Sequence, residues 1–407
     1  MAESAEIVRL GHGGDGVTAD GVFVPYTVPG DVVRIERAGS RARIVEILAS
    51  GPGRVSPPCP HFGPCGGCAL QHVARDAYLA WKREQVVTAL EQRGLRGVRV
   101  EDIRAVPPGT RRRAVFKARG TTRGAEIGFY EANSHNLINV IECPVLVPAL
   151  ANLLAPLRKE FSPLFKPGET AELHATATDS GVDLSLKLKR PPSPELFAAL
   201  AQMASRLKLA RLIWNGEPIS VAAPPLLGIG RFSVALPPEP FLQPTKEGEH
   251  ILQELVVEGV GAAKRIADLF SGCGTFALSL TQGRKLHAVD EGGAMLDALS
   301  TAARAGGADV GIERRDLFRR PLTPHELARF DAVVIDPPRP GAKAQAEQLA
   351  ASRVPRVVYV SCNVASFARD AKHLCDGGYS LLSVVPVDQF LWSPHVELVA
   401  VFERGAR

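Results

Sequence analysis

The feature that most limits the fold is a series of short apolar runs after Pro240. Four such runs, RIADLFS, KLHAVD, FDAVVIDPP and RVVYVSC, alternate with segments of helical character. Continuous apolar runs are typical of parallel strands, because these are buried on both faces, and strands that alternate with helices form βαβ units. The pattern predicts an α/β domain with a doubly wound, mostly parallel sheet in residues 241–407.

A glycine-rich turn follows the first of these runs. In RIADLFSGCGTFALSL, Gly272 and Gly274 let the backbone approach a ligand before an expected helix, and the next strand ends in Asp290, which can accept hydrogen bonds from ribose hydroxyls. With Ala277, the same glycines also satisfy the G-x-G-x-x-A pattern of dinucleotide-binding proteins. Asp290 lies 18 residues after Gly272, close to the roughly 20 expected for NAD. From this turn alone, an NAD-dependent oxidoreductase is a competing interpretation.

Two later strands end in side chains that suit catalysis. Asp336 closes one strand directly before two prolines, and Cys362 follows the next strand between Ser361 and Asn363. Ligands of open α/β sheets bind at the carboxyl ends of the strands, so both side chains are expected beside the cofactor. A buried structural cysteine is the alternative for Cys362. Its place at a strand end, opposite the Asp-Pro-Pro turn, favours a nucleophile.

A cluster of cysteines precedes this domain. Cys59, Cys65 and Cys68 lie within CPHFGPCGGCALQH, and Cys143 lies in ECPVL. The N-terminus has no signal-like segment and no run reaches the roughly 20 apolar residues of a membrane span, which predicts a soluble cytoplasmic protein. Disulfides do not persist in that compartment, so the cluster indicates a metal or catalysis. Four thiolates suit either zinc or an iron-sulfur cluster, and the spacing leaves both open.

The rest of the sequence predicts two further domains. Residues 1–52 contain short alternating strands broken by Gly and Pro, typical of a small antiparallel barrel, and residues 53–240 read as a cysteine segment followed by an α+β domain. The net charge of +5 is mild, but arginines gather locally. In the barrel, a solvated basic edge and an RNA-contacting face are equally compatible with Arg34, Arg37, Arg41 and Arg43. A second strip, expected to bind RNA phosphates, comprises Arg111, Arg112, Arg113, Lys117, Arg119 and Arg123.

Taken in order, these motifs resemble the class I S-adenosylmethionine-dependent RNA 5-methyluridine methyltransferases, most closely the members that act on 23S ribosomal RNA. The resemblance covers essentially the whole chain and includes TRRRA, IGFYEANSHNLINVIECPVL, FLQPT and the terminal HVELVAVF. It implies an RNA-binding TRAM barrel, which is OB-like, in residues 1–52. It also implies a central α+β domain with a 4Fe-4S cluster in residues 53–240 and a Rossmann-like methyltransferase domain in residues 241–407.

The resemblance also implies roles for single residues. The cluster ligands would be Cys59, Cys65, Cys68 and Cys143. The residues expected around S-adenosylmethionine are Gln243, Phe270, Thr275, Asp290, Asp316 and Asp336. Phe270 is equally compatible with a core position, and Asp316 with a helix cap. Thr275 stands where the family usually has Asn.

The implied reaction is covalent. The thiolate of Cys362 would add to C6 of uracil, which raises the electron density at C5 so that C5 can take the methyl group. Glu397, in the terminal motif, would then remove the C5 proton, and its apolar setting predicts a raised pKa. The expected substrate is a uridine in 23S ribosomal RNA, acted on by a monomer without a membrane partner. The alternatives are a transfer RNA uridine, an NAD-dependent oxidoreductase and a nonenzymatic RNA-binding iron-sulfur protein.

Overall fold

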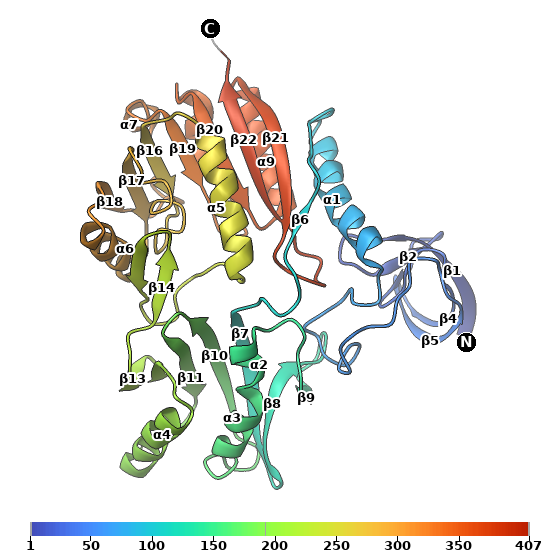
Figure 1. Ribbon diagram of the computed structural model, residues 1–407. Helices are drawn as coiled ribbons and strands as arrows, with labels where there is room; N and C mark the ends of the chain where they lie inside the picture. Colours follow the sequence, from blue (N-terminus) through green and yellow to red (C-terminus); the bar gives the residue numbers. More distant parts are fainter. Residues whose placement is uncertain (1, 192, 406–407) are drawn as a thin grey trace.

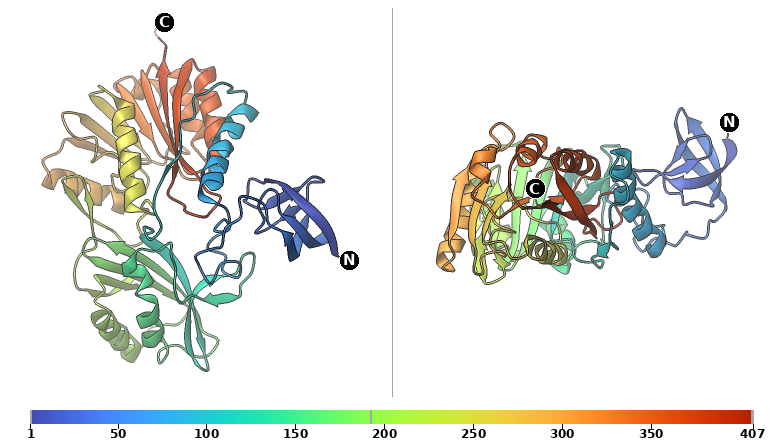
Figure 2. Two further views of the ribbon diagram at one scale, coloured as in Figure 1. Left: turned by 45° about the vertical axis from the view of Figure 1, so that its right-hand side comes forward. Right: turned by 90° about the horizontal axis from the view of Figure 1, so that it is seen from above.

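The computed structural model describes residues 2–191 and 193–405 (Figure 1). The described chain forms a closed barrel, a seven-stranded sheet and an eight-stranded sheet, with a separate two-stranded hairpin. Figure 2 shows the barrel extending to one side, away from both sheets. No helix in these ranges has the length and apolar character needed to cross a membrane.

The N-terminal barrel confirms the prediction of a small barrel, and all but one of its strand pairs in the described residues are antiparallel, as predicted. Its strands are β1 (Ala2–Leu10), β2 (Gly16–Thr18), β3 (Phe23–Val24), β4 (Val32–Ala38) and β5 (Arg41–Ala49), in the order β1-β2-β3-β5-β4. Alternate residues such as Ile7, Val33 and Ile35 are fully buried and fill the barrel. The four arginines of this barrel pair with carboxylates: Arg34 with Glu46, Arg37 with Glu3, Arg41 with Asp15, and Arg43 with Glu36.

The C-terminal sheet has the predicted doubly wound arrangement. Its order is β18-β17-β16-β19-β20-β22-β21-β6. The parallel strands are β16 (Arg265–Leu269), β17 (Lys285–Asp290), β18 (Val310–Arg314), β19 (Ala332–Ile335) and β20 (Arg356–Ser361). The strand β22 (Glu397–Arg404) runs antiparallel to both β20 and β21 (Tyr379–Asp388).

Helices cover both faces of this sheet because its strands are apolar on both sides. In β16, Ile266 packs in the core that includes α5 (Lys246–Val260), while Ala267 and Leu269 pack in the core that includes α9 (Val364–Asp376). α8 (Lys343–Ala351) packs beside α9. α6 (Gly293–Ala305) packs against β17, β18 and the hairpin of β14 (Leu226–Ile229) and β15 (Phe232–Ala235). A short helix, α7 (Pro324–Leu327), precedes β19.

The helix expected after the glycine turn is absent, and that prediction was wrong. Residues 272–280 form consecutive turns instead. The backbone N–H of Ala277 donates to Oδ2 of the buried Asp268 at 2.8 Å, and Gly274 has a φ of 90°. A φ of 90° lies outside the helical region, so Gly274 cannot belong to a regular helix.

The segment after the cysteines packs on the C-terminal sheet. α1 (Arg75–Gln92) contacts α9 and β21, and Val86 and Leu90 enter the same core as α9. Gly94, with a φ of 78°, follows the helix end. The chain then adds β6 (Arg104–Ala105) as an edge strand parallel to β21 (Figure 1). Residues 75–105, which the sequence places in the central region, therefore contact the methyltransferase-like sheet.

The central sheet has the order β13-β12-β11-β10-β7-β8-β9. Its strands are β7 (Arg113–Thr121), β8 (Gly124–Tyr130), β9 (Leu137–Asn139), β10 (Thr170–Thr178), β11 (Gly181–Leu188), β12 (Arg211–Trp214) and β13 (Glu217–Val221). Its helices are α2 (Pro148–Ala151), α3 (Leu154–Phe161) and α4 (Pro194–Arg206), the last capped by the Ser193 side chain. The strands and helices share one apolar core.

Candidate active site

A cavity of about 690 Å³ lies between the two sheets. One wall is built from residues at the carboxyl ends of β16, β17, β19 and β20, and the opposite wall comes from β7 and β10. Six residues expected at the site line this cavity: Gln243, Phe270, Asp290, Asp336, Cys362 and Glu397. Thr275 and Asp316 do not line it. Most of the predicted site residues therefore lie at the carboxyl edge of the parallel sheet.

The glycine turn forms an open cradle at one end of the cavity. The carboxylate of Asp290 accepts hydrogen bonds from the backbone N–H of Gly272 at 2.9 Å and of Gly292 at 2.7 Å. A Cβ placed on Gly272, which has a φ of 52°, would meet no protein atom within 4 Å. The space beside this glycine therefore belongs to the cavity and is free for a ligand that approaches the backbone.

Two aromatic rings border this cradle. The rings of Phe270 and Phe318 lie 5.4 Å apart, and Phe318 is 47% exposed. Oδ1 of Asp316 accepts from the backbone N–H of Phe318 at 2.9 Å and so shapes the turn that presents this ring. Thr275 lies on the side of α5, where its carbonyl oxygen accepts from Gln253 at 3.1 Å. The sequence analysis missed Phe318, although an aromatic residue two positions after an acid at a strand end was the available signal.

A thiol and two carboxyl groups meet at the other end of the cavity. The pKa of Cys362 is raised to about 12, mainly by burial and in addition by the charges of Glu397 and Asp336, while the charge of Arg339 opposes the shift. Burial also raises the pKa of Asp336 to about 7. The pKa of Glu397 lies well above its usual value because of burial and, secondarily, the charge of Asp336. Groups that shift one another's protonation in this way suit proton transfer.

Two glutamines connect the carboxyl groups. Nε2 of Gln243 donates to Oδ2 of Asp336 at 3.3 Å, and Nε2 of Gln389 donates to both Oε1 of Gln243 and Oε2 of Glu397 at 2.8 Å each. Both glutamines are buried. The sequence analysis missed Gln389, because no pattern in VDQFLWSPHVE distinguishes an active-site amide from a surface one.

The TRRRA motif positions Gln243, and the prediction that Arg112 binds RNA was wrong. Arg112 is only 4% exposed; its guanidinium donates to the carbonyl of Gln243 at 3.0 Å and to Glu249 at 2.6 Å. The neighbouring Arg113 donates to the carbonyl of Leu242. The motif thus ties β7 to the segment that carries Gln243.

The rest of the expected basic strip is largely engaged within the protein. Lys117 pairs with Glu172, and Arg119 pairs with Glu126. Arg111 and Arg113 line the cavity, so these two cations are the members of the strip placed beside the site.

The loop between β21 and β22, residues 389–396, is called the active-site loop here because Phe390 lines the cavity and Glu397 follows it. The cysteine segment holds this loop through backbone hydrogen bonds. The carbonyl oxygen of Trp392 accepts from the N–H of Ala69 at 2.9 Å and of Leu70 at 3.1 Å. Leu70 also packs with Leu391 of the loop.

The helix α1 holds the same loop by polar contacts. The hydroxyl of Tyr78 accepts from the N–H of Trp392 at 2.9 Å. Nζ of Lys82 donates to the carbonyl of Phe390 at 3.1 Å and to Oδ1 of Asp388 at 2.5 Å. The side chains of Lys82 and Asp388 are both 0% exposed. An ion pair wholly inside the protein therefore fixes one end of the active-site loop.

The four cysteines expected at the metal site share one neighbourhood. The pKa of Cys68 is raised to about 12, mainly by burial; a hydrogen bond with Gln71 opposes the shift, and the charges of Cys143, Cys65 and Cys59 add to it. In the ranges 2–191 and 193–405, no group of three or more His, Cys, Asp or Glu side chains is arranged to hold a metal ion. The donor chemistry, four free thiols, suits either zinc or an iron-sulfur cluster. The cationic Arg111 lies close enough to Cys68 and Cys143 to be affected by their charge.

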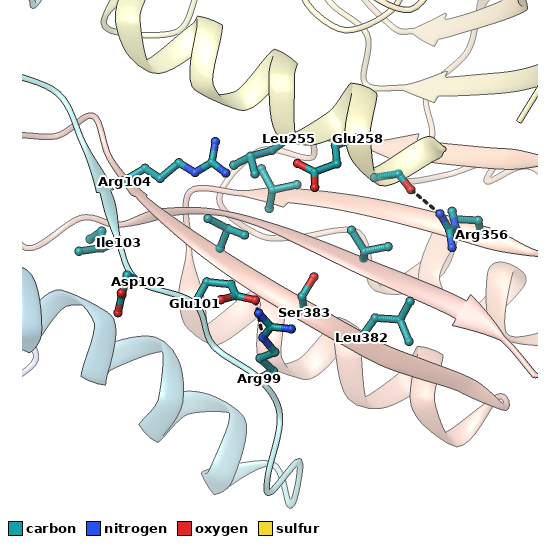
Figure 3. Close-up of a pocket in the computed structure, with 14 residues that line it drawn as sticks. Arg99, Glu101, Asp102, Ile103, Arg104, Leu255, Glu258, Arg356, Leu382 and Ser383 are labelled. Carbon is teal, nitrogen blue, oxygen red and sulfur yellow. Dashed lines mark hydrogen bonds and ion pairs between the residues drawn. The ribbon is translucent and has the colours of Figure 1, made fainter. Parts of the chain in front are cut away.

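A second cavity, of about 550 Å³, lies between α5, β21 and residues 99–104 (Figure 3). It contains none of the residues expected at the site. Three of its charged groups are engaged with nearby partners: Arg99 pairs with Glu101 at 2.6 Å, and Arg356 donates to the carbonyl of Gly259 at 3.3 Å. This cavity therefore does not gather a reactive set of side chains.

Comparison with known proteins agrees with this geometry. A solved structure of the Pyrococcus abyssi tRNA (uracil-54, C5)-methyltransferase, in complex with S-adenosyl-L-homocysteine, superposes with a TM-score of 0.77 at 23% identity over 98% of this chain and 100% of that chain. The fold is thus that of an S-adenosylmethionine methyltransferase with an N-terminal barrel.

Proteins with similar sequences show which family of methyltransferases this is. A family model described as tRNA (Uracil-5-)-methyltransferase matches residues 312–404. An uncharacterized RNA methyltransferase of Brucella suis is 46% identical over 98% of this chain and 97% of its own length. The 23S rRNA (uracil(1939)-C(5))-methyltransferase RlmD of Halomonas elongata is 33% identical over 98% of this chain and 88% of its own length. The chain therefore belongs to the S-adenosylmethionine-dependent RNA uracil-C5 methyltransferases.

Proposed function

We propose that this cytoplasmic enzyme methylates C5 of a uridine in 23S ribosomal RNA through a covalent bond between Cys362 and C6. The observation that carries the proposal is the meeting of one thiol, the buried carboxyl group of Glu397 and the half-buried one of Asp336 in the cavity that also contains the glycine cradle. Ribosomal RNA is favoured over transfer RNA because the relative named RlmD covers nearly the whole chain at 33% identity.

The first step of the proposed reaction is attack of the Cys362 sulfur on the uracil ring. Sγ of Cys362 forms a bond to C6 while the electrons of the C5–C6 double bond move toward O4, so that C5 becomes nucleophilic. The thiol proton must leave as this bond forms. Asp336 is the acceptor in this scheme, because it lines the same cavity as Cys362 at the end of the neighbouring strand, and burial raises its pKa to about 7.

Methyl transfer and elimination complete the cycle. Bound S-adenosylmethionine supplies a methyl group on a positively charged sulfur, and C5 accepts it. Glu397 then removes the remaining hydrogen of C5 as a proton, and the electrons of that bond re-form the double bond as sulfur leaves C6. Asp336 returns its proton to the departing sulfur, and Glu397 passes its proton to water. One proton is released for each methyl group transferred.

The residues present fit the cofactor. Asp290 and the open space beside Gly272 would receive the ribose and backbone-facing part of S-adenosylmethionine, and the rings of Phe270 and Phe318 would border the adenine. The proposed roles of Thr275 and Asp316 are indirect, since neither lines the cavity: Asp316 holds the turn of Phe318, and Thr275 belongs to the turn that forms the cradle.

Two further features of the proposal concern RNA and iron. Arg111 and Arg113 would contact phosphates of the RNA beside the cavity, and the barrel would act as a TRAM domain. The ligands of a 4Fe-4S cluster would be Cys59, Cys65, Cys68 and Cys143. The cluster would join the cysteine segment to the central sheet and so support the contacts of Ala69 and Leu70 with the active-site loop.

The test uses purified enzyme, radiolabelled S-adenosylmethionine and RNA from a strain that lacks the gene. We expect label in 23S ribosomal RNA as 5-methyluridine, and none with Cys362→Ala. Label in transfer RNA alone would replace the proposed substrate with the second candidate, for which the shared fold of the Pyrococcus abyssi enzyme is the supporting observation. Label in neither RNA would overturn the proposal.

A further inference from the structure

Gln389 lies between two side chains of the active site, Glu397 and Gln243, and binds both. It is 1% exposed, and its single amide nitrogen donates to Oε2 of Glu397 and to Oε1 of Gln243 at 2.8 Å each. Its own carbonyl oxygen is buried without a hydrogen-bond partner among the described residues. A buried acceptor without a partner is costly, so the amide keeps this orientation for the sake of the two hydrogen bonds that it donates.

The opposite orientation of this amide conflicts with an ionised Glu397. Turning the amide by half a rotation would place its oxygen against a carboxylate oxygen, where two acceptors repel each other. The Nε2 contact therefore matches the ionised form of Glu397, which is the form that accepts a proton.

We propose that Gln389 is a positioning residue for Glu397: its amide holds Oε2 and leaves Oε1 toward the cavity, so that an oriented base removes the C5 proton. This inference rests on the proposed covalent mechanism. Gln389 makes no bond to substrate in this scheme. It acts on the base through its hydrogen bond to Glu397, and its second hydrogen bond, to Gln243, fixes the orientation of the amide.

The groups around Glu397 explain why such a donor is needed. Asp336, beyond β19, and Cys362, beyond β20, are the titratable groups that face it, and Arg339, which also lines the cavity, acts on the thiol. Burial and the negative charge of Asp336 both favour the protonated form of Glu397, which cannot act as a base. The hydrogen bond from Gln389 opposes both effects, since it lowers the pKa of Glu397.

The substitution Gln389→Met tests this role, because methionine fills a similar volume without donating a hydrogen bond. Single-turnover reactions with labelled cofactor would follow two rates across pH: appearance of the methylated protein-RNA adduct, and its release as product. We expect the first rate to stay near that of the wild type. The acid limb of the release rate should move up by about 1 to 2 pH units, the size expected for one lost hydrogen bond to a charged group.

Two further variants separate this role from a structural one. Gln389→Asn keeps the amide but withdraws the donor by one methylene group, so the same shift is expected. Gln345→Met, in α8, removes another buried glutamine that bonds to the backbone of Leu322 at 2.8 and 3.1 Å, and it should leave the pH profile unchanged.

The outcomes distinguish this inference from the proposed function. A wild-type enzyme that forms no covalent adduct would refute the covalent mechanism, whatever Gln389 does. An adduct that both Gln389 variants release with the wild-type pH dependence would refute the inference alone. Loss of folding in both variants, with Gln345→Met folded, would also refute it, because the amide would then serve the fold rather than the base.

Discussion

The substitution Lys82→Met should release the active-site loop and lower stability and turnover, while the affinity for S-adenosylmethionine is retained. Nζ of Lys82 contacts Oδ1 of Asp388 at 2.5 Å and the carbonyl of Phe390 at 3.1 Å, and both charged side chains are 0% exposed. Methionine occupies the space but leaves the Asp388 carboxylate buried without its cation, and Oδ2 of Asp388 already has no partner in the described chain. Breaking a buried pair in this way costs about 3 to 5 kcal/mol.

That free energy should appear in thermal unfolding. For a domain of ordinary size it corresponds to a fall in Tm of about 6 to 20 °C. Turnover should fall as well, because the lost bond to Phe390 releases the segment between β21 and Glu397. The affinity for S-adenosylmethionine should stay unchanged, because Asp290 and the glycine turn lie on other strands. Calorimetry would measure both the melting transition and the cofactor affinity.

The double variant Lys82→Met with Asp388→Leu is the matched control. It removes both charges, so most of the lost stability should return, as replacing a whole buried pair with apolar groups is often neutral or stabilising. The reasoning would be refuted if Lys82→Met lost less than about 1 kcal/mol of stability, the range of an exposed pair, or if the double variant were less stable than the single one.

Two other predictions follow from the central region of the chain. Arg112→Met should lower the free energy of unfolding by about 3 to 5 kcal/mol, since it leaves Glu249 buried and unpaired. It should not change the salt dependence of RNA binding. Arg113→Ala should instead weaken RNA binding and make its affinity less dependent on salt. Equal effects of both variants on the salt slope would contradict the assignment of Arg112 to the fold. Protein prepared without oxygen should carry about four irons per chain, and Cys143→Ser should lose them as completely as Cys65→Ser. One zinc per chain, or iron retained by Cys143→Ser, would argue against the proposed ligand set.

The site residues that follow strands are the ones whose positions the sequence predicts best. Asp336 and Cys362 could be placed together because each follows an apolar run, and parallel strands bring their carboxyl ends to one edge. The direction of Arg112 could not be predicted in the same way. It faces inward because the segment around Gln243, far along the chain, packs against the start of β7 and needs a donor there.

Two other features of the site differ from the sequence prediction or were not predicted: the segment after Gly274 and the position of Gln389. The run after Gly274 has helical composition, but residues 272–280 form consecutive turns, in which the carboxylate of Asp268 accepts a hydrogen bond from the N–H of Ala277. Gln389 acquires its position only when the active-site loop is held between α1 and the cysteine segment. Contacts of this kind join residues more than 300 positions apart, and no local pattern carries them.

The most direct test of the account compares Glu397→Gln with the variant that also carries Cys362→Ala. If Cys362 attacks C6 and Glu397 acts only after methyl transfer, Glu397→Gln should methylate the uridine once and then stall, because the C5 proton cannot leave. The predicted result is a protein-RNA adduct that carries labelled methyl, survives denaturing electrophoresis and is absent from the double variant. Normal turnover by Glu397→Gln, or methylation of uridine by Cys362→Ala, would contradict the mechanism.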